Sequence, residues 1–263
     1  MWQDPLGLYA VGAFTPTLFN MTPTYLHASG ISFSTINNSS GTTINTITMG
    51  GVTHHRNGSS SGGAGSPISV TRTGNDVSIF AYAHIWGSGA NLEVPHGRGV
   101  TFRQATISGI MEYWSGYRGG LNVNVTVIDL NDGVHLIRYG QGRLSIEIRD
   151  EPGRAQHSAY NWSVSDPGMI TLFTHAYGGS ANNILQFPWI AAHEFGHAMG
   201  VGDGFGFGHG GDTTHGNVHS IMTTWPHGAT RLDLELVMRA HRSDRWQTWD
   251  NNRRFIRAFG IHM

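Results

Sequence analysis

Four segments after residue 75 have the alternation or the composition of β-strands. Residues 121–130 (LNVNVTVIDL) and 143–149 (RLSIEIR) alternate apolar with polar positions, which is the two-residue period of a half-buried strand. Residues 76–86 (DVSIFAYAHIW) and 168–176 (GMITLFTHA) are rich in apolar and β-branched residues. The sequence therefore predicts four strands in this region.

Three further segments carry helix signals. Thr101 and Gln104 form a capping box, and apolar residues follow at helical spacing up to about residue 114. Pro188 suits the first turn of a second helix that runs to about residue 200. Thr230 and Asp233 open a last helix with apolar residues along one side. Strands and helices in this order predict an α+β fold.

The composition of residues 13–75 differs from that of the rest of the chain. Ser, Thr, Gly and Asn dominate from residue 31 onward, as in INNSSGTTINT and NGSSSGGAGS. Such sequence buries too little apolar surface to offset the entropy of the chain, so we expect a flexible linker or weak hairpins. The chain is thus divided into a short N-terminal segment (1–12), an extension (13–75) and an ordered domain (76–263).

Composition excludes several classes of protein. The chain has 16 basic and 17 acidic residues, a balance that argues against a nucleic-acid-binding protein. The sequence has no run of about 18 apolar residues, so we expect no membrane span. The first residues, MWQDPLGLYAVG, lack the positive and apolar regions of a secretory signal peptide, and we expect none. Cysteine is absent, which excludes disulfides and thiolate metal ligands.

The segment 191–203 (AAHEFGHAMGVGD) carries the candidate chemistry. His193 and His197 are four residues apart, so on a helix both imidazoles leave the same face and can converge on one ion. Glu194 points about 100° away from His193, so it cannot easily bind the same ion but can reach a water bound to that ion. This is where a general base is needed for metal-assisted hydrolysis.

Two imidazoles do not complete a metal site. Gly200 and Gly202 can adopt positive φ and reverse the chain, which would return Asp203 to the ion as a third ligand. The fourth position would then be left for water, as in catalytic zinc sites. His209 is an alternative third ligand, and a second ion site that includes Asp212 is also open.

The segment HEFGHAMGVGD resembles the extended motif of the metzincin metallopeptidases, HExxHxxGxx(H/D). HEFGH is similar to the matrixin and gametolysin side of that clan, while Asp203 in place of the usual histidine is similar to the snapalysin-like minority. Ser220-Ile221-Met222 matches the clan's methionine turn, with Met222 below the metal. Some members have a tyrosine two residues after this methionine; Thr224 stands there, so no tyrosine role is carried over.

The resemblance implies a zinc endopeptidase with a zincin-like α+β fold: a twisted mixed sheet, an active-site helix, the methionine turn and a C-terminal helix. It implies that His193, His197 and Asp203 bind Zn²⁺ and that Glu194 is the general base. It also implies that substrate peptide lies extended along a sheet edge, for which we select 143–149.

A second resemblance concerns the N-terminal segment. Residues Asp4, Pro5, Leu6, Gly7 and Leu8 resemble the DPxGL junction that ends the Rhs-repeat core of bacterial polymorphic toxins. That family implies a shell protein that cleaves itself after this motif, a released toxin or effector, and a cognate immunity protein. It further implies contact-dependent, type VI-like delivery by a bacterium into a target cell. Asp-Pro-x-Gly is also a simple turn sequence.

Two other functions remain open at this point. The same metal and Glu194 would serve a toxin that hydrolyses a substrate other than peptide. Alternatively, zinc is structural in a binding module, which needs no Glu194. The remaining histidines are interpreted as solvated or hydrogen-bonded residues without a role in the site; they include His157, His175, His227 and His241.

Overall fold

The computed structural model describes residues 66–130, 142–204, 219–223, 225–249 and 252, and the backbone of three strands before them. These three are β1 (Ile31–Asn37), β2 (Thr43–Met49) and β3 (Val52–Gly58). They form a three-stranded antiparallel sheet in the order β1-β2-β3. Of the two arrangements expected for the extension, the structure therefore has successive hairpins.

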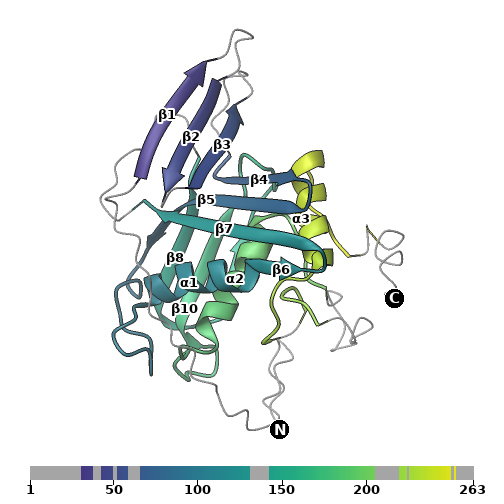
Figure 1. The fold of residues 1–263 in the computed structure, drawn as a ribbon. Helices are drawn as coiled ribbons and strands as arrows, with labels where there is room; N and C mark the ends of the chain where they lie inside the picture. Colours follow the sequence, from purple (N-terminus) through teal and green to yellow (C-terminus); the bar gives the residue numbers. More distant parts are fainter. Residues whose placement is uncertain are drawn as a thin grey trace.

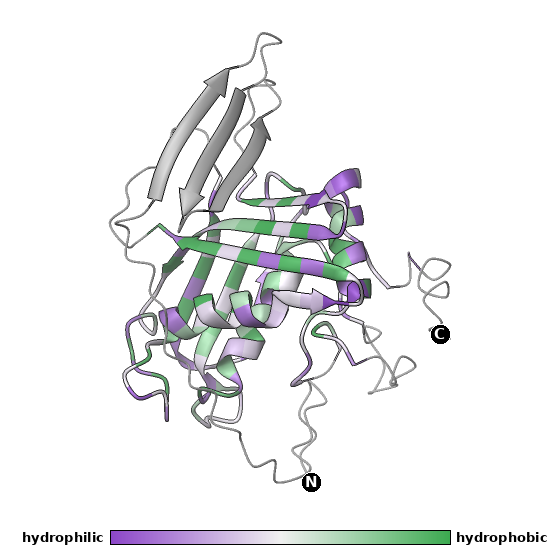
Figure 2. Cartoon of the chain, in the orientation of Figure 1, coloured by the Kyte–Doolittle hydropathy of each residue, from purple (hydrophilic) through white to green (hydrophobic). Residues whose placement is uncertain are grey.

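The other sheet has seven strands, and hydrophobic residues are concentrated along its longer strands (Figures 1 and 2). They are β4 (Ile68–Thr73), β5 (Asp76–Trp86), β6 (Gly116–Arg118), β7 (Leu121–Asp129), β8 (Leu144–Gly153), β9 (Gln156–Ser158) and β10 (Met169–Ala176). The order is β6-β7-β5-β8-β10-β9, with β4 paired to β5.

The sheet is mixed, as predicted. Strands β7, β5, β8 and β10 are parallel, whereas β4, β6 and β9 pair antiparallel with their neighbours. The four predicted strands are confirmed, and they are the four parallel ones. The antiparallel β6 and β9 have three residues each, too few to show an alternating pattern.

Two expectations about the sheet are corrected. The selected edge, 143–149, lies within β8, which pairs with β5 on one side and β10 on the other. Its alternation records two differently covered faces, a property of central and edge strands alike. In addition, β4 pairs with β5 over its whole length, so the sheet includes residues N-terminal to Asp76.

The three predicted helices are present. They are α1 (Phe102–Trp114), α2 (Phe187–Ala198) and α3 (Arg231–Ser243). Both predicted capping boxes are formed, by Thr101 with Gln104 and by Thr230 with Asp233. Pro188 lies in the first turn of α2, where a missing N–H costs nothing.

Helices α1 and α2 lie together against one face of the sheet (Figure 1). The backbones approach closely, because a Cβ atom built on Gly109 would lie 2.3 Å from the Pro188 carbonyl oxygen. The buried indole of Trp114 donates a 2.8 Å hydrogen bond to the carbonyl of Ala192. Helix α2 is consequently held along the core, with nearly all its side chains buried. Among the described helices, none is long and apolar enough to cross a membrane.

Candidate metal centre

The two histidines of α2 are each fixed by a main-chain carbonyl. Nδ1 of His193 lies 2.8 Å from the oxygen of Ile221, and Nδ1 of His197 lies 2.7 Å from that of Val201. A carbonyl oxygen only accepts, so each Nδ1 carries the proton and donates it. Each Nε2 is then the nitrogen left for a metal ion, an arrangement that orients metal-binding histidines in general.

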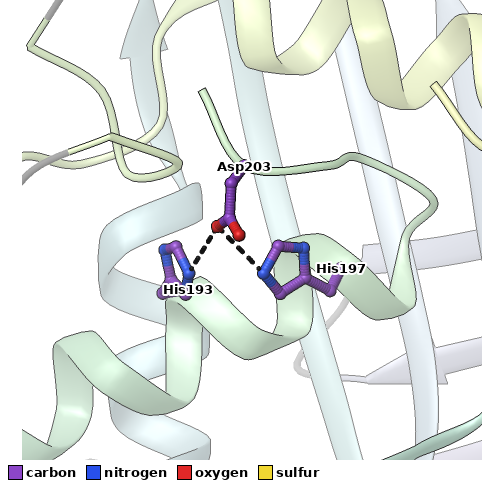
Figure 3. Close-up of side chains that lie close together, drawn as sticks. All are labelled: His193, His197 and Asp203. Carbon is purple, nitrogen blue, oxygen red and sulfur yellow. Dashed lines mark ion pairs between the residues drawn. The ribbon is translucent and has the colours of Figure 1, made fainter. Parts of the chain in front are cut away.

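Asp203 returns to these nitrogens as the glycine turn predicted (Figure 3). Its Oδ1 lies 3.2 Å from Nε2 of His193 and 3.2 Å from Nε2 of His197. Neither contact has the geometry of a hydrogen bond, so the two contacts are ion pairs that require a protonated histidine. Ligand atoms 2.0–2.1 Å from a tetrahedral ion lie about 3.3–3.4 Å apart, so the observed spacing fits a shared cation such as zinc.

Among the described residues, no other group of three or more His, Asp or Glu side chains brings ligand atoms this close together. The three atoms of this group lie within 4.8 Å of one another. The structure thus brings together the three residues that the sequence predicted as metal ligands.

The turn before Asp203 depends on one glycine. Gly200 has φ +89°, and its N–H donates to the carbonyl of His197, which ends α2. A Cβ on Gly200 would also lie 2.5 Å from the ring of Trp162. Gly202, which we expected to share the reversal, does not have positive φ.

The predicted methionine turn lies against the ligand helix. Met222 is fully buried, and a Cβ built on Gly196 would lie 2.3 Å from its sulfur. Gly196 stands between the two candidate ligand histidines on α2, so Met222 packs directly beneath them. The Oγ of Ser220 accepts from the Met222 N–H at 3.0 Å and donates to Asp233 at 3.1 Å, which ties the turn to α3.

Charge in the centre is distributed unevenly. Burial opposes protonation of His197, but the contact with Asp203 and the charge of Glu194 outweigh it and raise the pKa of His197 to about 9. Burial also opposes the charged form of Asp203, which would raise its pKa, yet the two histidines hold the pKa of this carboxyl well below its usual range. Without a metal, the centre is therefore an imidazolium–carboxylate contact at neutral pH.

Glu194 is inside the protein, with 5% of its surface exposed. Its Oε2 is buried and makes no hydrogen bond. Burial raises the pKa of Glu194, while His197, His193 and Arg154 partly oppose the shift. Its carboxylate does not belong to the converging group, in agreement with the direction predicted from the helix.

No pattern in the sequence marks the aromatic residues that surround the centre. Trp189 lies on His193 with ring centroids 5.2 Å apart, and Trp246 lies on His197 at 5.8 Å. His157, on β9, lies 6.1 Å from His197 and 5.7 Å from Trp246, and its Nε2 donates to the carbonyl of Pro167. A hydrogen bond of His157 agrees with the expectation of a solvated or hydrogen-bonded histidine. Its position beside the candidate ligand His197 was not expected, because no local pattern links a three-residue strand to α2.

Several predicted residues lie outside the described residues. They are the junction residues Asp4, Pro5, Leu6, Gly7 and Leu8, the alternative ligand His209, Asp212 of the second ion site, and Thr224. These predictions stay as they were made from the sequence.

Comparison of the chain with protein-family models, curated proteins and solved structures finds no match.

Proposed function

We propose that this chain is a zinc-dependent endopeptidase of metzincin type. The observation that carries the proposal is the equal 3.2 Å spacing of Asp203 Oδ1 from both histidine Nε2 atoms, with Glu194 buried beside them. Elements in the order sheet, ligand helix, methionine turn and C-terminal helix also agree with the resemblance.

The donor set favours zinc. Two neutral imidazoles and one carboxylate match the three protein ligands of catalytic zinc sites, which keep a fourth position for water. Magnesium and calcium prefer sites made of oxygen ligands alone. The hydrogen bonds of both Nδ1 atoms raise the basicity of the ligands and fix their orientation.

Bound zinc would supply a Lewis acid for the scissile carbonyl and an acidified water. Glu194 would be the general base for the attacking water and then the general acid for the leaving amine. The rise of its pKa through burial brings the carboxyl closer to neutral pH, where a general base and acid is most effective. Met222 supports the ligand helix from below and takes no part in proton transfer.

Strand β9 replaces 143–149 as the proposed peptide-binding edge. Among the described strands it pairs with β10 alone, and its His157 lies beside the ligand His197. An extended peptide that adds to β9 would run past the metal centre with its backbone hydrogen-bonded to the strand.

We further propose that the domain is an Rhs-associated toxin or effector. The support is the DPLGL sequence at residues 4–8, which resembles the junction between an Rhs shell and its released tip. The proposal includes delivery by a bacterium into a target cell, protein substrates in that cell, and an immunity protein that protects the producer.

The decisive variant is Glu194→Gln, with Glu151→Gln as a matched control because Glu151 is exposed and its ion pair with Arg149 is long, at 3.6 Å. Glu194→Gln is expected to bind one zinc per chain and to lose about 10²- to 10⁴-fold in proteolysis. Metal analysis and mass spectrometry of cleaved peptides in a cell lysate measure both. Full proteolysis by Glu194→Gln would refute the proposed mechanism.

Two outcomes point to the other functions. Toxicity that requires Glu194 without any cleaved lysate protein would indicate a hydrolase with a non-peptide substrate. Bound zinc together with a biological effect that is the same in Glu194→Gln and the wild type would indicate a binding module in which the metal is structural.

A further inference from the structure

Each ligand histidine lies nearly flat against an indole. Trp189 comes from the same helix, one turn before His193, with an interplanar angle of 28°. Trp246 comes from the segment after α3, far along the chain from His197, and its ring is within 18° of parallel to the imidazole. The second contact is therefore supplied by tertiary structure alone.

The main chain next to Trp246 holds the segment that leads to Asp203. The N–H of Gln247 donates to the carbonyl of Gly200 at 2.7 Å, and the N–H of Gly202 donates to the carbonyl of Gln247 at 2.8 Å. These two hydrogen bonds flank Val201, whose own carbonyl accepts from Nδ1 of His197. One short segment thus supports the acceptor of His197 and the chain that carries Asp203.

Trp246 itself has little freedom to move. A Cβ on Gly202 would lie 3.1 Å from its Nε1, so the indole fills the space above this glycine. Trp162 packs edge-on against it, with centroids 6.2 Å apart and an angle of 73°. Trp162 is anchored in turn, because its Nε1 donates to the carbonyl of Ala198 at 3.0 Å.

We infer that Trp246 is a positioning residue of the metal centre, which fixes the plane of the His197 ring so that Nε2 faces Asp203. The inference rests on the metal site of the proposed function and not on peptide hydrolysis. Residues that orient metal ligands typically change metal affinity by about 10- to 100-fold when replaced. Trp246 touches no reacting group, so its effect acts through the ligand.

The test compares three variants of the full chain. Trp246→Leu removes the aromatic face and keeps apolar volume, whereas Trp246→Phe keeps an aromatic face. Trp86→Leu is the control, because Trp86 also stacks on an imidazole, that of His84 at 6.4 Å and 17°, outside the metal centre. Zinc affinity is measured by competition with a chelator, and the visible spectrum of bound Co²⁺ reports ligand geometry.

Trp246→Leu is expected to bind zinc about 10- to 100-fold more weakly than the wild type and to change the Co²⁺ spectrum. Trp246→Phe should restore most of the affinity, and Trp86→Leu should match the wild type. Equal zinc affinity and an unchanged Co²⁺ spectrum in Trp246→Leu would overturn the inference. A wild-type protein that binds no zinc would instead overturn the metal site and the proposed function.

Discussion

The raised pKa of His197 makes the affinity of the proposed zinc site depend on pH, because zinc has to replace a proton there. His197 has a pKa raised to about 9, against an ordinary value of 6.5. Its Nδ1 donates to Val201, so the proton that must leave is the one on Nε2. Asp203 adds no second proton, because its pKa is held well below the usual range.

The size of the effect follows from the distance between pH and pKa. At pH 7, removal of a proton from a group with pKa about 9 costs about 3 kcal/mol. Zinc is consequently expected to bind about 100-fold more weakly at pH 7 than at pH 9, with a change of about tenfold per pH unit between them. Because the pKa of His197 is raised, the zinc affinity should increase with pH up to about pH 9, above which His197 is deprotonated even without zinc.

Competition with a chelator at pH 6.5 to 9, corrected for the protonation of the chelator, gives this dependence. Calorimetry at pH 7 in two buffers of different ionisation enthalpy counts the protons released, and we expect about one per zinc. Asp203→Asn is the control in the metal-free protein: without the carboxylate, the pKa of His197 measured by NMR should fall. A zinc affinity that is flat from pH 7 to 9, with no proton released, would refute the reasoning.

Three further predictions concern stability. Gly196→Ala improves helix propensity by about 1 kcal/mol, but its Cβ would lie 2.3 Å from the Met222 sulfur, and such overpacking costs about 1–3 kcal/mol. Thermal unfolding of this variant should therefore show a lower Tm than that of the wild type. An unchanged or higher Tm would contradict the contact between Gly196 and Met222. Gly109→Ala should cost more, because its Cβ meets the Pro188 carbonyl, and a urea midpoint equal to that of the wild type would argue against the close crossing of α1 and α2. Burial lowers the pKa of His241 to about 4, so between pH 6.5 and 4 the unfolded chain binds a proton that the folded chain does not. The free energy of unfolding therefore falls by up to about 3 kcal/mol as the pH falls through this window. Urea unfolding at pH 7.5 and 4.5 should show a smaller loss of stability for His241→Gln than for the wild type, and equal losses would exclude this histidine as the cause.

Local signals in the sequence were sufficient for the helices. Each capping box is a contact between residues three apart, so Thr101 and Thr230 marked the starts of α1 and α3 without any knowledge of the fold. The ligand spacing of His193 and His197 is local for the same reason, since one helical turn separates them. Asp203 could also be predicted as a third ligand, because a short turn at Gly200 connects it to the helix.

The order of strands was beyond the sequence. Alternation in 143–149 shows that the two faces of β8 differ, but it does not show whether a neighbour hydrogen-bonds on each side. The choice between centre and edge depends on partners that are distant in the chain. For this reason the short edge strand β9 had no signal, and neither did the place of its His157 beside the ligand helix.

By itself, the sequence predicted which residues of this protein could bind a metal ion and where its three helices and four longer strands lie, because these properties depend on residues that are close together in the chain. Only the tertiary structure decided what holds the ligands in place: the carbonyl of Ile221 for His193, and Trp246 with Gln247 for His197 and the turn to Asp203. The physical reason is that a metal site needs fixed ring orientations, and orientation is set by packing between segments that no local pattern connects.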